Sequence, residues 1–271
     1  EDAYGVFFKI YLQNKQGTFD LNQDLDGMLF GSMVAADFNA DGFMDIVATG
    51  IDIYESPTTM YLINDGKGQF SQNFLPTAAV NYSIVKSIDA GDLNNDGYYD
   101  IIMAGDDENG NASSTILLYN PLKQAFDKVE HDFGIANFAV STSLVLLDYN
   151  NDNQLDVLVS SQDENYESKT ALYKNSEKSI NQKPLPPMVL NTEVKDNYIH
   201  FNWDGASDDK TPQKALLYEI SIGTEKGKAD LAKYTVNTTN WMLLKDNLPE
   251  QIYWTVKTID ASKVYSVASD V

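Results

Sequence analysis

An acidic nine-residue segment occurs three times in the sequence at a nearly constant interval. The copies are Asp37-Phe-Asn-Ala-Asp-Gly-Phe-Met-Asp45, Asp92-Leu-Asn-Asn-Asp-Gly-Tyr-Tyr-Asp100 and Asp148-Tyr-Asn-Asn-Asp-Asn-Gln-Leu-Asp156, and they begin 55 and 56 residues apart. A second marker keeps the same step: Tyr61-Leu-Ile-Asn64, Leu117-Leu-Tyr-Asn120 and Leu172-Tyr-Lys-Asn175, with an earlier copy at Tyr11-Leu-Gln-Asn14. Two markers at one period indicate structural repeats, which limit the possible folds more than any other feature of this chain.

Each repeat has the pattern of short β-strands. Apolar runs such as residues 141–147 precede an acidic segment, and runs such as Asp45-Ile-Val-Ala-Thr-Gly50 follow it. These runs are rich in β-branched residues and are bounded by Gly, Asn and Asp, which favours strands. A third strand carries the Asn marker, and a fourth follows a Gly-rich turn such as residues 64–70. Four short strands in one period are typical of a propeller blade, whereas no window has the apolar periodicity of a helix.

Counting these strands predicts a partial propeller of about three and a half blades. Residues 5–25 supply the third and fourth strands of a blade, residues 28–77 and 78–132 form complete blades, and residues 135–176 supply three strands. Because a propeller closes on itself to remove its sheet edges, we expect upstream blades or strands from another chain. The first residues, Glu1-Asp2-Ala3, do not resemble a signal peptide, so we expect a mature product or a piece of a longer protein.

A change of composition between Ser176 and Pro187, to Lys, Asn, Gln and Pro, predicts a domain boundary. It separates a repeat domain at residues 1–180 from a second domain at residues 187–271. Apolar runs at residues 198–203, 215–222, 240–244 and 252–259 are typical of the antiparallel strands of a sandwich. The predicted fold class is therefore all-β, with a partial β-propeller followed by an immunoglobulin-like sandwich.

The acidic segments have the donor set of a calcium site. Each offers side-chain oxygens at positions 1, 3, 5 and 9 and a backbone carbonyl at position 7, and Ca²⁺ prefers six to eight such oxygens. Position 6 is Gly42, Gly97 or Asn153, as a turn with positive φ requires. An EF-hand would need Glu at position 12, where this chain has Ala48, Met103 and Val159, so we predict calcium loops in β-hairpins instead. Without a cation, carboxylates about 4–5 Å apart repel by roughly 3–4 kcal/mol per pair.

The first of these segments, with Phe30-Gly31 ahead of it, resembles the FG-GAP/VCBS repeat of integrin-α-like β-propellers. Such propellers usually have about seven blades, more than this chain supplies. The resemblance covers residues 5–176 and implies about three structural Ca²⁺ ions. The ligands that it implies are Asp37, Asn39, Asp41, Phe43 (carbonyl) and Asp45; Asp92, Asn94, Asp96, Tyr98 (carbonyl) and Asp100; and Asp148, Asn150, Asp152, Gln154 (carbonyl) and Asp156.

Residues 187–271 look like a fibronectin type III domain. Trp203 matches the core Trp of its second strand, Tyr218 matches the aromatic residue of its third, and Leu248-Pro249 with Tyr253 matches its tyrosine corner. The chain stops at Val271, within the last strand of such a domain, so we expect truncation at this end as well. The resemblance implies a surface protein, because the two modules often occur together in bacterial and protist surface proteins.

The composition excludes several classes of function. A net charge of −21 argues against nucleic acid and against an anionic membrane surface as partners. The chain has no Cys, and its only histidines are His131 and His200, which leaves little for thiolate sites or for His-based catalysis. No apolar run is long enough to insert into a membrane as a helix. No nucleophile and base can be paired from these residues, so we do not expect an enzyme.

Two functions stay open after these exclusions. One is an extracellular adhesion or recognition module, which binds a protein or a glycan on an exposed propeller face. The other is a subunit of a surface filament, in which neighbouring copies complete the open blades. Glycosylation sequons occur at Asn81, Asn111 and Asn237, about as often as chance predicts. The candidate tyrosines for contact with a ligand are Tyr54, Tyr82 and Tyr166, which we expect on exposed loops.

Overall fold

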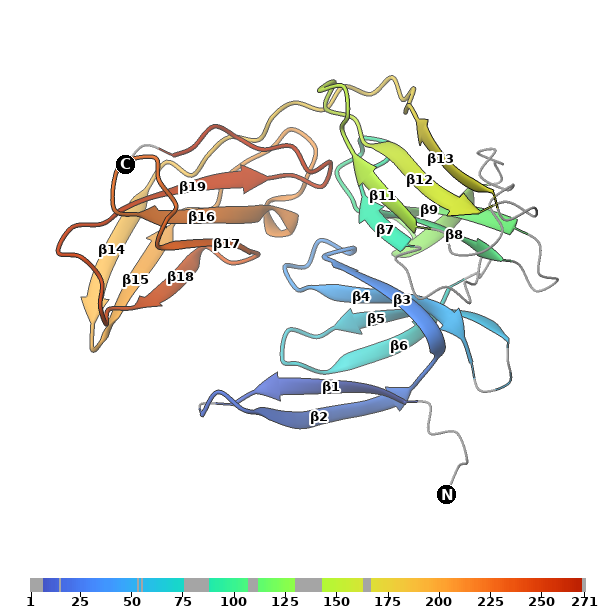
Figure 1. Ribbon diagram of the computed structural model, residues 1–271, viewed down its shortest axis with the longest axis horizontal. Helices are drawn as coiled ribbons and strands as arrows, with labels where there is room; N and C mark the ends of the chain where they lie inside the picture. Colours follow the sequence, from blue (N-terminus) through green and yellow to red (C-terminus); the bar gives the residue numbers. More distant parts are fainter. Residues whose placement is uncertain are drawn as a thin grey trace.

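The structure is a computed structural model that describes residues 7–14, 16–52, 54, 56–75, 88–106, 112–129, 143–162 and 167–269. It is an all-β protein, in which the described helical structure is a single 3₁₀ turn at Gln213–Ala215 (Figure 1). Within these ranges no helix has the length and apolar character that crossing a membrane requires. The predicted features at Glu1, Asn81, Tyr82, Asn111, His131, Tyr166 and Val271 lie outside the described residues, as does the side chain of Phe30.

The N-terminal part consists of four antiparallel sheets in which neighbouring strands follow one another along the chain. Their strand counts agree with those expected from the repeats. The first sheet is β1 (Phe7–Gln13) and β2 (Phe19–Asp26), and the second is β3 (Leu29–Ala36), β4 (Asp45–Ile51), β5 (Pro57–Asn64) and β6 (Phe70–Phe74). The third is β7 (Ile88–Gly91), β8 (Asp100–Asp106), β9 (Ala112–Asn120) and β10 (Ala125–Val129), and the fourth is β11 (Ser143–Leu147), β12 (Asp156–Gln162) and β13 (Ser168–Tyr173).

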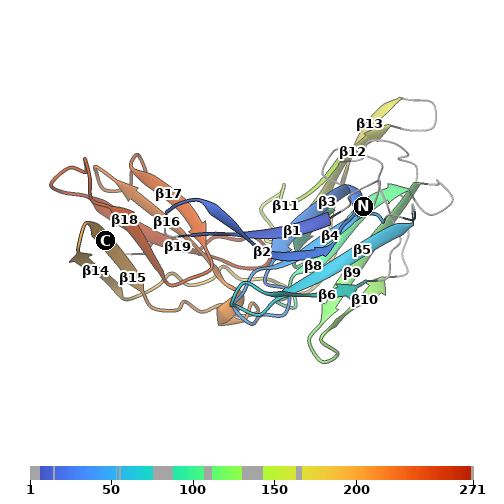
Figure 2. The same ribbon diagram turned by 90° about the horizontal axis from the view of Figure 1, so that it is seen from below.

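The first strands of successive sheets lie side by side: β7 contacts β3 on one side and β11 on the other. The second, third and fourth sheets are therefore arranged around a common edge formed by their first strands (Figures 1 and 2). The sheets of the described residues do not close into a ring (Figure 1). All three acidic segments connect the first strand of a sheet to its second strand, so they lie at the same end of neighbouring sheets.

Two apolar clusters fill the spaces between these sheets. Between the second and third sheets, Phe38 is fully buried and meets Tyr61 and Phe126 edge to face, with ring centroids 5.8 and 5.6 Å apart. Between the third and fourth sheets the cluster is aliphatic and includes Ile102, Leu144 and Val159. Burying such side chains contributes about 1.5–3 kcal/mol each, which fixes the second, third and fourth sheets against one another. The acidic segments are thus attached to a rigid base.

The C-terminal part is a pair of three-stranded antiparallel sheets around a third cluster, which includes Phe201, Tyr218 and Val256. One sheet has the order β14 (Leu190–Lys195), β15 (Tyr198–Trp203) and β18 (Asn240–Leu244). The other has the order β17 (Ala232–Val236), β16 (Leu217–Gly223) and β19 (Tyr253–Ile259). The strand expected at residues 215–222 begins later, because Ala215 closes the 3₁₀ turn that follows Pro212.

The three residues that carry the second resemblance differ in their surroundings. Trp203 and Tyr218 belong to the core cluster, as expected, with ring centroids 5.8 Å apart. The Tyr218 hydroxyl accepts a hydrogen bond of 3.0 Å from the backbone N–H of Ala206. The Tyr253 hydroxyl instead accepts a 2.8 Å bond from the side chain of Gln251. Tyr218, rather than Tyr253, is therefore the tyrosine tied to a backbone group.

Candidate metal centres

The three acidic segments adopt the same hydrogen-bonded loop. In each, the carboxylate at position 1 accepts hydrogen bonds from the backbone N–H groups of positions 5 and 6. The two distances are 3.0 and 2.8 Å at Asp37, 3.1 and 2.7 Å at Asp92, and 3.1 and 2.9 Å at Asp148. The chain therefore winds around its first aspartate, which draws the side chains of positions 3 and 5 toward the same point.

The side chains at positions 3 and 5 are held by a second set of bonds. In the first loop, Asn39 Oδ1 accepts from Asp41 N–H at 3.0 Å, and Asn39 Nδ2 donates to Asp41 Oδ2 at 2.9 Å. The pairs Asn94–Asp96 and Asn150–Asp152 repeat both contacts. The other oxygen of the position-5 carboxylate accepts from the N–H of position 7, which is Phe43, Tyr98 or Gln154, at 2.8, 3.0 and 3.1 Å.

The backbone of position 6 has the conformation that the sequence predicts. Its φ is 99° at Gly42, 96° at Gly97 and 63° at Asn153, which confirms the expected left-handed turn. Position 4 is left-handed as well, with φ of 56° at Ala40, 55° at Asn95 and 59° at Asn151. Sequence reasoning missed this second turn, although Asn at position 4 in two copies is a usable signal, since Asn tolerates positive φ.

The aspartate at position 9 ties each loop to the third strand of its sheet. Asp45 Oδ1 accepts from Asn64 N–H at 2.9 Å, and Asp156 Oδ1 accepts from Asn175 N–H at 2.7 Å. Asp100 makes the corresponding bond, 2.9 Å long, with the N–H of Tyr119. These partners lie in the Asn marker of the repeat. Sequence reasoning used this marker only to measure the period. The structure shows that the marker contains the hydrogen-bonding partner of the loop.

The other oxygen of the position-9 aspartate bonds back to position 2. Asp100 Oδ2 accepts from Leu93 N–H at 2.9 Å, and Asp156 Oδ2 accepts from Tyr149 N–H at 3.4 Å. Asp45 Oδ2 also accepts a 2.9 Å bond from the hydroxyl of Tyr61. All three aspartates are fully buried. Position 9 therefore closes the base of the loop.

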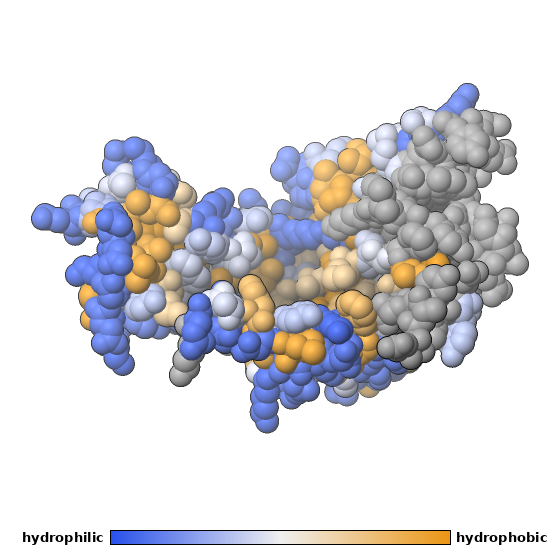
Figure 3. Space-filling view, turned by 60° about the horizontal axis from the view of Figure 1, so that its bottom comes forward, coloured by the Kyte–Doolittle hydropathy of each residue, from blue (hydrophilic) through white to orange (hydrophobic). Residues whose placement is uncertain are grey.

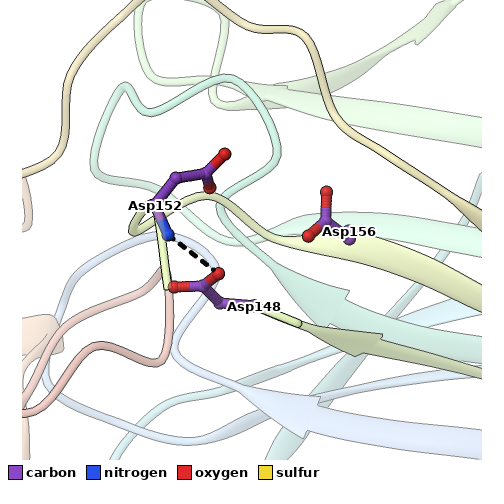
Figure 4. Close-up of side chains that lie close together, drawn as sticks. All are labelled: Asp148, Asp152 and Asp156. Atoms are coloured by element: carbon purple, nitrogen blue, oxygen red, sulfur yellow. Dashed lines mark hydrogen bonds between the residues drawn. The ribbon is translucent and has the colours of Figure 1, made fainter. Parts of the chain in front are cut away.

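The third loop brings three carboxylates together (Figure 4). Asp148, Asp152 and Asp156 each place an oxygen within 4.8 Å of the other two, the one such cluster of three acids among the described residues. Lys174 Nζ lies 3.3 Å from Asp152 Oδ2. Although partial burial acts in the opposite direction, hydrogen bonds from Asn150 and Lys174 lower the pKa of Asp152. A lysine therefore offsets part of the negative charge of this loop.

In the first two loops, the aspartates at positions 1 and 9 are buried without a lysine partner. Burial raises the pKa of Asp37 and of Asp92 to about 7, and that of Asp45 to about 6. Burial also raises the pKa of Asp100 well above its usual range. No ion pair with a lysine involves either loop in the described part of the chain. A divalent cation with a preference for oxygen would offset this cost, so the donor set fits Ca²⁺.

Comparison with known proteins supports the repeats. Residues 37–103 and 92–159 match the FG-GAP-like repeat family, so the chain contains two FG-GAP-like repeats. The two matched ranges together include all three acidic segments. No curated protein matches the chain. Among solved structures, a crystal structure of several titin domains is similar at 10% identity with a TM-score of 0.24, over 97% of this chain and 86% of the titin chain. That similarity is too slight to assign a fold.

The buried acids predict an inverse pH dependence in the metal-free protein. The pKa of Asp37 and Asp92 is about 7 in the folded state, above the ordinary value of 3.8, so their ionisation opposes folding. In a chelator, we expect the free energy of unfolding to fall by on the order of 3 kcal/mol between pH 4.5 and pH 7.5. Urea unfolding at several pH values measures this, and Asp37→Asn with Asp92→Asn should flatten the curve. A metal-free wild-type protein that gains stability over this range would contradict the assignment.

We expect the aspartate at position 9 to stabilise the fold even without a metal ion. Asp45→Asn replaces an accepting oxygen with an NH₂ group that faces donors, which should lower the free energy of unfolding by about 1–3 kcal/mol. Asp41→Asn, in the same loop but partly exposed, should change the stability in chelator by much less. Chemical unfolding of both variants in chelator separates the two positions. Equal losses would show that Asp45 has no special anchoring role.

Proposed function

We propose that this chain is an extracellular calcium-binding recognition protein, in which structural Ca²⁺ ions order the loops of propeller blades. The observation that supports it most is the recurrence of one hydrogen-bonded oxygen cage in three loops, two of which bury acids without a cationic partner. If these acids were only solvated turn residues, nothing would require the same four polar positions to recur in every loop. A buried, uncompensated carboxylate is costly unless it is protonated or coordinates a metal.

In this proposal about three Ca²⁺ ions bind, one in each loop. Positions 1, 3 and 5 supply side-chain oxygens, and position 7 supplies a carbonyl. The position-9 aspartate can anchor the loop and coordinate the ion as well, because each carboxylate oxygen has more than one lone pair. The ions have a structural role, since they neutralise the cage and hold the first two strands of each sheet in register.

The surrounding fold completes the proposal. The four N-terminal sheets would be blades of a propeller, because the first strands of the second, third and fourth sheets lie side by side and each sheet contains at most four strands in sequence order. The C-terminal pair of sheets would be a fibronectin type III-like domain. A protein or a glycan would bind on an exposed face of the blades, with a role in adhesion rather than catalysis. Extracellular calcium modules bind at about 10⁻⁴–10⁻³ M, which favours a location outside the cell.

One of the three sequons is engaged in the fold. Asn237 Nδ2, the atom that a glycan would modify, donates a 3.2 Å hydrogen bond to the carbonyl of Gly42 in the first loop. Glycosylation there would displace this contact. The proposal therefore does not include a glycan at Asn237.

Calorimetry and thermal unfolding test the calcium assignment. We expect about three Ca²⁺ per chain, a melting temperature lower by many degrees in chelator, and recovery when Ca²⁺ is added. Asp41→Asn, Asp96→Asn and Asp152→Asn should each remove one site, because each neutralises the central carboxylate of one loop. Tyr54→Phe, at a side chain that is 80% exposed and is not a loop ligand, is the control. Absence of Ca²⁺ binding at millimolar concentration would refute the assignment.

A second candidate function is a subunit of an extracellular filament. It is favoured by the exposed apolar side chains of β1 and β2, where Phe7 is 60%, Phe19 65% and Leu21 52% exposed. In the described part of the chain β1 pairs with β2 alone, and β13 pairs with β12 alone, so both sheets have an unpaired edge. Unpaired edges with apolar side chains favour strand addition between chains.

Sedimentation velocity over a wide range of concentration tests this second candidate. A filament subunit should assemble as its concentration rises, and Phe7→Ser with Phe19→Ser should shift assembly to higher concentration. Leu122→Ser, at a 95% exposed position in the turn between β9 and β10, serves as the matched control. A wild-type chain that stays a monodisperse monomer at high concentration would contradict it.

A further inference from the structure

The acidic loops have two sides, and only one of them faces the cage. In the second loop the non-ligand residues at positions 4 and 6, Asn95 and Gly97, contact the C-terminal part and the segment before it. In the second loop Asn95 is 2% exposed, donates through Nδ2 to the carbonyl of Ser179 at 2.8 Å, and accepts at Oδ1 from the hydroxyl of Ser262 at 3.1 Å. A Cβ atom at Gly97 would lie 2.1 Å from the carbonyl oxygen of Lys210. The backbone of this loop therefore packs directly on a sandwich loop.

The other two loops make contacts of the same kind. In the first loop, the carbonyl of Gly42 accepts from Asn237 Nδ2 at 3.2 Å. In the third, Asn153 Nδ2 donates to the carbonyl of Asn181 at 3.3 Å. Position 6 thus contacts the C-terminal part or the segment leading to it in all three loops. Spacing alone gives no sign of this, because the partners lie between 28 and 195 residues away in sequence.

Other polar contacts lie at the same junction. Asp92 N–H donates to the carbonyl of Ala261 at 3.0 Å, and Lys263 Nζ lies 3.2 Å from Asp89 Oδ2. Beside them the surface is hollowed between the sandwich and the repeats (Figure 3), and a cleft of about 290 Å³ lies at this junction. The cleft has lining residues from both parts, among them Tyr99 and Leu217, and it interrupts the contact between them. Such junctions permit relative motion unless specific contacts hold them.

We propose that ion occupancy of the first two loops locks the C-terminal sandwich against the repeats. This inference rests on the proposed calcium binding. When the cage is filled, positions 4 and 6 are fixed where Ser262, Lys210 and Asn237 meet them. When it is empty, carboxylate repulsion widens the loop and moves these same positions away from their partners. Calcium would therefore set the orientation of the two parts as well as the stability of the repeats.

Thermodynamic linkage gives the first test. If the ion favours docking, docking must favour the ion by the same factor. Asn237→Ala with Ser262→Ala removes two docking bonds without touching a loop side chain, so we expect Ca²⁺ affinity to fall about fivefold or more at two of the three sites. The matched control is Asn191→Ala with Ser71→Ala, at exposed strand positions away from the junction, and it should bind Ca²⁺ like the wild type. Calorimetry on the full chain measures both.

A distance measurement gives the second test. The chain has no cysteine, so Asn73→Cys on β6 and Thr192→Cys on β14 place one spin label on each part. We expect a narrow distance distribution between the labels in Ca²⁺ and a broad one in chelator. Adding Asp41→Asn and Asp96→Asn should leave the distribution broad in Ca²⁺.

The outcomes separate this inference from the function on which it rests. If Ca²⁺ does not bind at all, both the proposed function and the lock are wrong. If Ca²⁺ binds and stabilises the chain, but the distances do not change and the docking variant keeps wild-type affinity, the lock is wrong and calcium binding stands. Loss of affinity in the docking variant together with a broadened distance distribution in chelator supports the lock.

Discussion

The N-terminal sheets depend on a buried aspartate that closes the base of each acidic loop. Asp45, Asp100 and Asp156 accept backbone N–H groups from the third strand with one oxygen and bond back to the start of the loop with the other. One side chain thus joins three segments of a sheet that lie apart in the sequence. Because a buried carboxylate must be hydrogen-bonded, the loop and the third strand can form only together. This explains why the acidic segment and the Asn marker recur with one period.

The same loops concentrate negative charge where the fold has little to offset it. Nine of the 40 acids of the chain lie in the three segments. Burial raises the pKa of Asp37 and Asp92 to about 7, so at neutral pH the metal-free fold holds carboxylates that are close to protonation. The third loop differs, since Lys174 contacts Asp152 there. The acidic composition therefore serves in part as a set of oxygen donors, and the cost of burying them makes a cation an integral part of the proposed structure.

The loops also connect the two parts of the molecule. Their inner side carries the carboxylates, and their outer side carries Asn95, Gly42 and Gly97, which meet the sandwich and the segment before it. A backbone displacement on the inner side of so short a loop also moves the outer side, because the residues of the two sides alternate along the same few peptide units. The lock proposed above would allow a fold of several small sheets to respond as a unit to ion binding in the loops.

The sequence by itself determined the all-β class, the period, the number of strands in each sheet and the left-handed turn at position 6. These follow from local rules: β-branched runs favour strands, and Gly and Asn most readily adopt the positive φ that Gly42 and Asn153 have. Only the tertiary structure decided where the loops point and what they contact. The anchor at Asp45 and the docking contact of Asn95 with Ser262 join residues far apart in sequence, and no local pattern encodes such pairs. Tertiary packing brings these residues together. It therefore decides which acids are buried and which face of each loop contacts the rest of the molecule.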